Sequence, residues 1–177
     1  MVENMSQNEH TGPMEMFILA AISRGGLKTL YAFQQAAGLQ PGSIKAPIQG
    51  LEKDGLLNRQ EGAKRGRRAM ALTEAGERFL REEWTKSMEA RREIESVLRS
   101  AIVALLMGDI VKALNFLSES ISCRLQGEGH KELEAISPQT APIDFHTAMR
   151  SYYLNERRVM EIGVLNRFAE NLKSIRM

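Results

Sequence analysis

The stretch from Leu39 to Gly76 constrains the fold of this chain most strongly, because apolar residues with helical spacing are followed there by a dense basic loop. Ile44, Ile48 and Leu51 fall on one side of a helix when successive residues are placed about 100 degrees apart. We expect this side to pack inward. The opposite side of the same helix must then face solvent.

The outward side of this helix carries side chains suited to a nucleic-acid groove. We expect Ser43 to be the N-cap, and small Ala46 and Gly50 to let the helix backbone approach a groove closely. The candidate groove-binding residues are Ser43, Lys45, Gln49 and Lys53. A second interpretation begins the helix at Ala46, because Pro47 suits an early helix position. That interpretation removes Lys45 from the set.

Two short extended runs, Leu57–Gln60 and Arg68–Thr73, predict a β-hairpin after Gly55 ends the helix. Four cations within five residues of its connecting loop suit contact with phosphates or with a minor groove. These candidate wing residues are Lys64, Arg65, Arg67 and Arg68. An outward-cationic helix or a basic turn alone is also common on solvated surfaces. Together, the order helix, turn, helix, basic hairpin and long helix is that of a winged helix-turn-helix, so we expect binding to double-stranded DNA.

This region resembles the PadR-type transcriptional regulators. The matching residues are Gly42, Ser43, Ile44, Ile48, Leu51, Glu52, Gly55–Leu57, Arg67, Arg68 and Leu72–Gly76, the last of which MarR-type proteins share. A first helix that begins near Met14 favours PadR, since MarR-type proteins place a substantial helical segment before the winged helix. The resemblance covers about residues 14 to 80, and it departs at Lys28–Tyr31, where PadR-type proteins usually carry a His-Gly-Tyr-like sequence. Pro47 also falls one position after the proline of the family's recognition helix.

The positive charge of the chain coincides with this region. The whole chain has a formal net charge of only +2, which does not by itself indicate nucleic-acid binding. Residues 43–68, however, contain seven basic against three acidic side chains, whereas residues from Glu82 onward contain 13 basic and 14 acidic ones. The field that would attract DNA therefore lies at the predicted winged helix.

The sequence offers no catalytic constellation. Cys123 is the only cysteine, the three histidines are scattered without ligand spacing, and no glycine-rich phosphate loop is present. The longest apolar run, Ala101–Met107, is too short to span a bilayer, and the N-terminus lacks the apolar segment of a signal peptide. We expect a cytoplasmic protein that is not an enzyme, has no cofactor or metal and does not bind membranes.

We expect mainly helical structure with a small β-hairpin wing, in an N-terminal winged helix-turn-helix followed by long helices. The predicted divisions are a disordered tail at 1–12, a DNA-binding domain at 13–80 and a helical dimerisation or effector region at 81–177. The predicted helices are Met14–Arg24, Lys28–Ala37, a long helix from Thr73 to about Met107, Ile110–Leu125 and Asp144–Arg176.

The long helices predict a homodimer, because palindromic operators require two recognition helices about one duplex turn apart. PadR resemblance implies the same arrangement and a repressor. The candidate dimerisation residues are Leu80, Trp84, Ile94, Leu98, Leu165, Phe168 and Leu172. Packing within one chain, as a helical hairpin, is the alternative for these apolar helices.

A small-molecule effector pocket between the helices is a further hypothesis. Its candidate lining residues are Trp84, Met88, Phe116, Tyr152 and Tyr153. The same residues also suit an ordinary core. For the whole chain, the alternatives are a MarR-like ligand-responsive regulator and a protein-interaction adaptor that retains a winged helix only as a scaffold.

Overall fold

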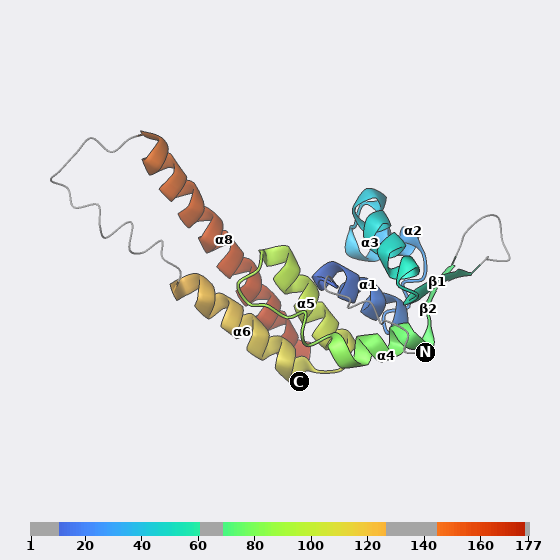
Figure 1. Cartoon of the computed structure of the whole chain (residues 1–177). Helices are drawn as coiled ribbons and strands as arrows, with labels where there is room; N and C mark the ends of the chain where they lie inside the picture. The colour runs from blue at the N-terminus through green and yellow to red at the C-terminus, as the bar shows by residue number, and fades with distance from the viewer. Residues whose placement is uncertain (1–10, 61–68, 127–144, 176–177) are drawn as a thin grey trace, which may run out of the picture.

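The structure, a computed structural model, describes residues 11–60, 69–126 and 145–175, which form helices and a two-stranded antiparallel hairpin (Figure 1). The expectation of a mainly helical chain with a small β-hairpin is confirmed. Of the tail predicted at 1–12, residues 1–10 lie outside the described residues. In chain order the elements are α1 (Pro13–Ser23), α2 (Leu30–Ala37), α3 (Pro41–Lys53), β1 (Leu57–Gln60), β2 (Ala69–Leu72), α4 (Glu74–Glu83), α5 (Ile94–Leu106), α6 (Ile110–Gln126) and α8 (Phe145–Ile175).

Helix α1 is the centre of the N-terminal half. Every residue from Met16 to Ile22 is buried, so α1 is enclosed on all sides and has no solvent-facing stripe in this stretch. It packs against α3, α4, α5 and β2. Full burial of a large apolar side chain such as Ile18 or Leu19 contributes about 1.5–3 kcal/mol. This helix therefore supplies the platform on which α3 rests.

A tight turn joins α2 to α3. Thr29 caps α2 by accepting a hydrogen bond from the Ala32 amide at 3.1 Å. Gly38 ends α2 with a φ of 63°, a left-handed conformation that glycine adopts without a Cβ clash. Helix α3 then begins at Pro41. Only residues 38–40 therefore separate the two helices.

The hairpin is tied to the segment before α2. The predicted hairpin is present, and its two strands pair antiparallel with Leu57 opposite Leu72. The Met70 amide of β2 donates to the Lys28 carbonyl oxygen at 2.7 Å. This bond extends the sheet pairing toward the loop that follows α1, so the hairpin and the start of α2 hold a fixed relation.

Thr73 fixes the start of α4 against the base of the hairpin. Its hydroxyl donates to the Gly55 carbonyl oxygen at 2.7 Å and accepts from the Gly76 amide at 3.0 Å. Its own amide donates to the Leu56 carbonyl oxygen at 3.1 Å. Thr73, where the sequence predicts the start of this helix, is thus its N-cap, and it also joins α4 to the segment that follows α3.

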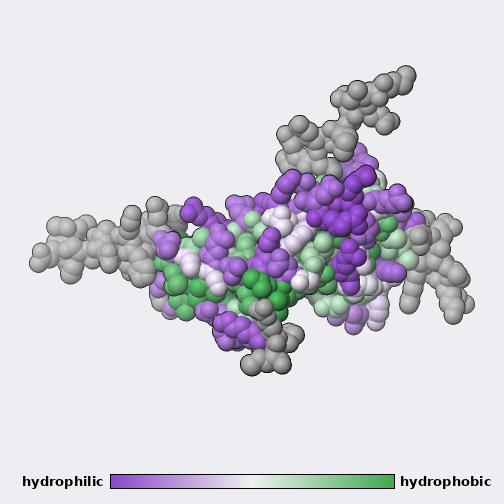
Figure 2. Space-filling model, turned by 90° about the horizontal axis from the view of Figure 1, so that it is seen from below, coloured by the Kyte–Doolittle hydropathy of each residue, from purple (hydrophilic) through white to green (hydrophobic). Residues whose placement is uncertain are grey.

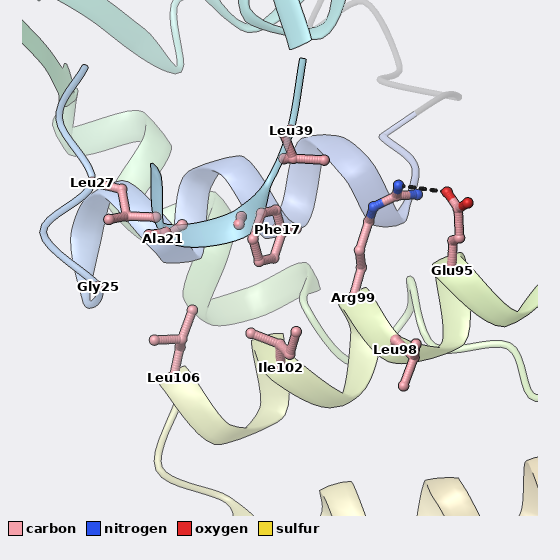
Figure 3. A pocket seen from close by; sticks show the side chains of 12 residues that line it. Phe17, Ala21, Gly25, Leu27, Leu39, Glu95, Leu98, Arg99, Ile102 and Leu106 are labelled. Atoms are coloured by element: carbon pink, nitrogen blue, oxygen red, sulfur yellow. Dashed lines mark hydrogen bonds and ion pairs between the residues drawn. The ribbon is translucent and has the colours of Figure 1, made fainter. Parts of the chain in front are cut away.

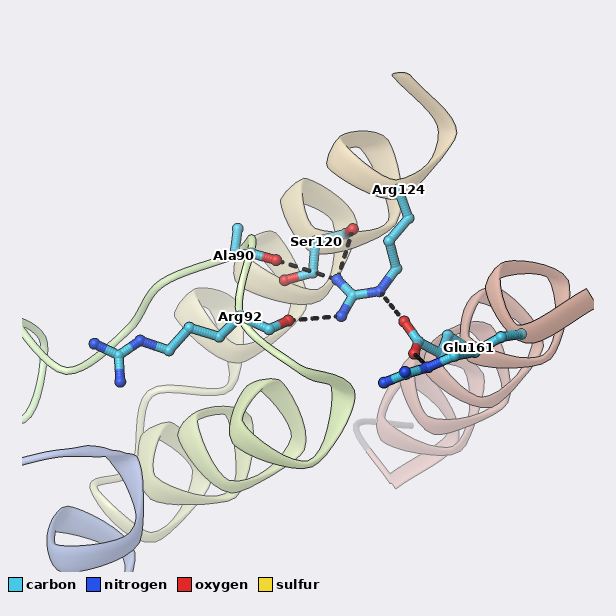
Figure 4. A network of polar contacts seen from close by, with 6 residues as sticks. Ala90, Arg92, Ser120, Arg124 and Glu161 are labelled. Atoms are coloured by element: carbon cyan, nitrogen blue, oxygen red, sulfur yellow. Dashed lines mark hydrogen bonds and ion pairs between the residues drawn. The ribbon is translucent and has the colours of Figure 1, made fainter. Parts of the chain in front are cut away.

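The prediction of one helix from Thr73 to Met107 is wrong. Helix α4 ends at Glu83 and α5 begins at Ile94, although no glycine or proline lies in the segment between them. The described contacts account for the break (Figure 4). Arg124 of α6 donates to the carbonyl oxygens of Ala90 at 3.1 Å and Arg92 at 2.8 Å. An arginine distant in sequence thus satisfies two backbone acceptors that a continuous helix would have paired internally.

The same arginine joins three parts of the chain. Its Nε donates to Glu161 of α8 at 3.0 Å, and Nη1 also donates to the Ser120 carbonyl oxygen at 3.2 Å. Only 10% of the Arg124 side chain and 17% of the Glu161 side chain are exposed. We refer to Arg124, Glu161 and the two carbonyl groups of Ala90 and Arg92 as the Arg124 clasp.

A second core lies between α5, α6 and α8. Its buried residues include Val97, Leu117 and Leu165. Val103, on another side of α5, belongs instead to the cluster of buried residues around α1, which we call the first core. Helix α5 therefore bridges the two cores. Packing of this kind locates the C-terminal helices relative to the N-terminal half without a separate linker.

Three candidate dimerisation residues belong to these cores. Leu80 is fully buried in the first core, and Leu165 and Leu172 are buried in the second. Their assignment to a contact between two chains is corrected to packing within one chain, the alternative that the sequence had left open. The remaining candidates are half-buried against the same cores: Trp84, Ile94, Leu98 and Phe168.

Helix α6 packs one side into the second core. Asp109 accepts a hydrogen bond from the Lys112 amide at 2.8 Å and so supports the first turn. The inward side is formed by Ala113, Phe116, Leu117 and Ser120. Val111 and Leu125 are exposed.

Helix α8 is confirmed within about one residue of its predicted limits. At 31 residues it is about 46 Å long, and its N-terminal half extends beyond α5 and α6 (Figure 1). Several large apolar side chains of the extending part are exposed. They are Tyr153, Leu154, Val159 and Met160.

Candidate nucleic-acid interface

Helix α3 has the two distinct sides that its sequence predicts. Ile44, Ile48 and Leu51 are at most 2% exposed and pack in the first core. The four candidate groove-binding side chains all lie in solvent on the other sides of the helix: Ser43, Lys45, Gln49 and Lys53. Helix periodicity alone fixed this division, because the buried residues recur at intervals of three and four.

The expected role of Ser43 as N-cap is wrong. Gln40 is the N-cap, Pro41 occupies the first helical turn, and the Ser43 hydroxyl donates to the Gln40 carbonyl oxygen at 2.8 Å. A start at Ala46 is also excluded, so Lys45 remains on the helix. Proline at the first turn needs no amide partner there, which explains the earlier start.

Small residues on the solvent side of α3 leave its backbone accessible there. Added Cβ atoms at Gly42 and Gly50 would meet no other atom within 4 Å, and Ala46 lies exposed between them. Lys45 and Gln49 stand beside this low strip. A helix of this kind permits close approach of a flat or grooved partner while the longer side chains reach outward.

The lysines of α3, Lys45 and Lys53, make no ion pair within the part of the chain that the structure describes. Glu52, the acidic residue within α3, instead pairs with Arg59 of β1. This pair neutralises the acid and links α3 to the hairpin, so that the net charge of the exposed side of α3 is positive. Lys53 in the last turn is also favoured by the helix dipole.

The candidate wing residues lie outside the described residues: Lys64, Arg65, Arg67 and Arg68. What the structure describes is the paired part of the hairpin that precedes and follows them. Gln60 pairs with Ala69 at the end of this ladder, which points away from α5, α6 and α8 (Figure 1).

The candidate effector pocket is brought together only in part. Met88 and Phe116 line a hollow of about 410 Å³. Trp84 lies nearby, with the Lys112 ammonium 5.0 Å from its ring centroid. The side chain of Tyr152 is outside the described set, and Tyr153 is 65% exposed on the extending part of α8. Much of the hollow is lined by polar residues: Thr85, Asp109, Lys112, Asn115 and Glu119.

A larger groove, missed from the sequence, lies between α1, α2 and α5. Its volume is about 620 Å³, and its residues come from three stretches of the chain, 17–27, 36–39 and 95–106. One local signal was present, since Leu98, Ile102 and Leu106 form a stripe at intervals of four along α5. Which elements cover that stripe depends on tertiary packing and cannot be read from spacing.

No protein-family model, curated protein or solved structure matches this chain. Among the described helices, none combines the length and apolar content needed to cross a bilayer. The described residues also contain no group of three or more His, Cys, Asp or Glu side chains placed to hold a metal ion.

Proposed function

We propose that this chain is a sequence-specific DNA-binding transcriptional regulator whose helix α3 enters the major groove. The observation that carries the proposal is the division of α3 into a deeply buried side and a low, cationic solvent side. Ile44 and Ile48 anchor the helix, while Lys45, Gln49 and Lys53 remain exposed. An anchored helix with exposed cations and an amide can present the same side chains to each DNA site without reordering.

The order and connections of the elements support a winged helix-turn-helix of the PadR-like kind. Helices α2 and α3 are joined by a tight turn, and the hairpin follows α3 directly. The bond from the Met70 amide to the Lys28 carbonyl oxygen holds the hairpin beside the start of α2. In such a fold the second helix of the motif reads the major groove while the wing contacts the DNA backbone or minor groove.

The side chains assign different tasks to the residues of α3. Gln49 can form two hydrogen bonds with an adenine edge, which would confer sequence preference. Lys45 and Lys53, without ion-pair partners among the described residues, suit phosphates or guanine acceptors. The exposed glycine at position 50 keeps the backbone between them accessible to the groove wall.

We further propose that the regulator acts as a homodimeric repressor on a palindromic operator. In the extending half of α8, Tyr153 and Met160 are exposed and lie seven residues apart, on one side of the helix, and a second copy would cover this apolar side. Apolar patches also occur on the side of the molecule where α6 and α8 lie (Figure 2). The proposed dimer surface is therefore the exposed part of α8, in place of the core residues predicted from the sequence.

The test is salt-titrated binding of the purified full chain to DNA from upstream of its own coding sequence and to an unrelated duplex. Gln49→Ala is expected to reduce the preference for the specific site by about 1–3 kcal/mol. Arg65→Ala is expected to weaken binding to both duplexes and to reduce the salt slope by about one unit.

Lys173→Ala provides the matched control, because Lys173 is an exposed cation on α8, far from α3 in the chain. It is expected to leave both affinities unchanged. Equal effects of Lys173→Ala and Arg65→Ala would contradict the assigned surface. Absence of binding to either duplex at low salt would favour the adaptor hypothesis.

A further inference from the structure

The groove between the N-terminal half and α5 offers a binding site that the proposed DNA interface does not use. Its walls come from α1, from the end of α2 with the following turn, and from α5 (Figure 3). Leu39 enters from above, while Ile102 and Leu106 of α5 point toward it from below, with Phe17 between them. The full lining is Phe17, Ala21, Gly25, Leu27, Ala36, Ala37, Leu39, Glu95, Leu98, Arg99, Ile102 and Leu106.

The chemistry of this lining is simple. Its side chains are aliphatic apart from Phe17 and one ion pair formed by Glu95 and Arg99 of α5. Such a surface favours an apolar ligand body and offers one charged position to orient it. A volume of about 620 Å³ is large enough for a ligand of the size of a medium-chain fatty acid.

Arg99 is the group that selects the ligand's charge. Its side chain is 20% exposed, whereas that of its partner Glu95 is 74% exposed. The described hydrogen bond uses one guanidinium nitrogen, Nη2, which donates to Glu95 at 2.9 Å. Because a guanidinium has five N–H donors, the other donors can bind a second carboxylate without loss of this contact.

We propose that this groove binds a small aliphatic carboxylate, with its chain between α1, α2 and α5 and its carboxylate on Arg99. The regulatory part of this inference rests on the proposed DNA-binding function. According to this regulatory proposal, the bound carboxylate changes the position of α2 and α3 and hence the affinity of the chain for DNA.

The coupling follows from how weakly α2 is held. Phe33 is the one buried residue of α2, and its ring packs edge-on to that of Phe17, with centroids 6.3 Å apart. Phe17 itself lines the groove, and Leu39 lies two residues before α3 begins at Pro41. A ligand that contacts Phe17 and Leu39 therefore touches both the anchor of α2 and the turn that positions α3.

The site is tested by calorimetric titration of the full chain, without DNA, using decanoate as the probe. Decyltrimethylammonium, with the same chain length and the opposite charge, controls for nonspecific amphiphile binding. We expect saturable binding of one decanoate per chain and no saturable binding of the cation.

Three variants locate the binding. Arg99→Gln retains much of the side chain and is expected to weaken decanoate binding at least tenfold, while Glu95→Gln leaves it unchanged or tighter. Ala36→Phe fills the groove from α2 and is expected to abolish binding. Far-UV circular dichroism verifies that each variant is folded, and Lys86→Gln, at an exposed cation outside the groove, is the matched control.

Equal binding of the two amphiphiles, or an Arg99→Gln variant that binds as the parent does, would overturn the site. Occupation of the groove by a second copy of the chain would also overturn the site. This outcome is recognised if decanoate binds only at protein concentrations where sedimentation shows a monomer. The effect on DNA is measured separately, with and without saturating decanoate. Loss of DNA binding in both conditions rejects the proposed function alone, whereas DNA binding that decanoate leaves unchanged rejects the regulatory part alone.

Discussion

Removal of the Arg124 side chain tests what holds the C-terminal helices to the rest of the chain. In the Arg124 clasp, one guanidinium binds two carbonyl oxygens of the segment between α4 and α5 and the carboxylate of Glu161 on α8. Arg124→Ala removes all of these donors at once. It leaves a carboxylate that is only 17% exposed and two backbone acceptors without their charged partner.

The expected cost follows from these contacts. Loss of one partner from a buried ion pair costs about 3–5 kcal/mol. Glu161 keeps a second arginine, Arg157, at 2.9 Å and retains some access to water, which lowers this cost. The unpaired carbonyl groups add to it until water replaces the guanidinium. We expect a loss of about 3 kcal/mol in the free energy of unfolding, or a fall of about 6–12 °C in Tm for a chain of this size.

Urea unfolding followed by far-UV circular dichroism and by fluorescence measures this loss. Trp84 is the only tryptophan and packs against both cores beside the clasped segment, so its fluorescence reports on that segment. Coincident transitions by the two probes are required before one free energy is assigned.

Arg157→Ala is the matched control, because it removes an arginine from the same carboxylate at the exposed side of α8. It is expected to change stability little. In a double-mutant cycle with Glu161→Gln, we expect a coupling energy above about 1 kcal/mol for Arg124. Equal losses for the two arginine variants would refute the view that burial of the clasp determines its contribution.

Three further predictions concern single positions. An added Cβ at Gly76 would lie 2.0 Å from the Leu56 carbonyl oxygen, so Gly76→Ala is expected to lower the free energy of unfolding by about 1–3 kcal/mol or more in urea unfolding. Gly50→Ala, in open space on a helix, is expected to raise it by about 0.5–1 kcal/mol and yet to weaken DNA binding in the salt titration. Met160→Glu, at a position 63% exposed, is expected to lower the dimer fraction in sedimentation without loss of monomer stability.

Each of these has a contradicting result. A Gly76→Ala variant as stable as the parent would mean that α4 and the hairpin base separate at little cost. Unchanged DNA affinity in Gly50→Ala would show that the α3 backbone does not approach a groove wall closely. An unchanged sedimentation profile for Met160→Glu would place any dimer contact elsewhere.

The sides of α3 were predictable because all of their information is local. Three apolar residues at intervals of three and four determine which side packs, whatever the rest of the fold does. The start of α3 was harder to predict, since Ser43 suits an N-cap and Pro41 suits the first helical turn. The helix starts at Pro41, which needs no partner for a backbone amide in the first turn.

The break between α4 and α5 was not predictable from its own residues. The segment lacks glycine and proline, and polar residues interrupt the apolar spacing there only at Ser87 and Arg91. Arg124, which satisfies the carbonyl groups of Ala90 and Arg92, is more than 30 residues away. Periodicity likewise does not determine whether Leu165 or Leu172 packs within one chain or between two, because either kind of packing buries the same apolar stripe.

Helix α2 has a single buried side chain, Phe33, and this has a consequence for the time scale of its motions. A helix with one buried side chain needs little free energy to detach, so its amides are expected to exchange with solvent through local opening. Those of α1, enclosed from Met16 to Ile22, would exchange only when the whole domain unfolds. Mild denaturant would therefore accelerate exchange in α1 strongly and in α2 hardly at all, and would separate two cooperative folding units within the first 40 residues.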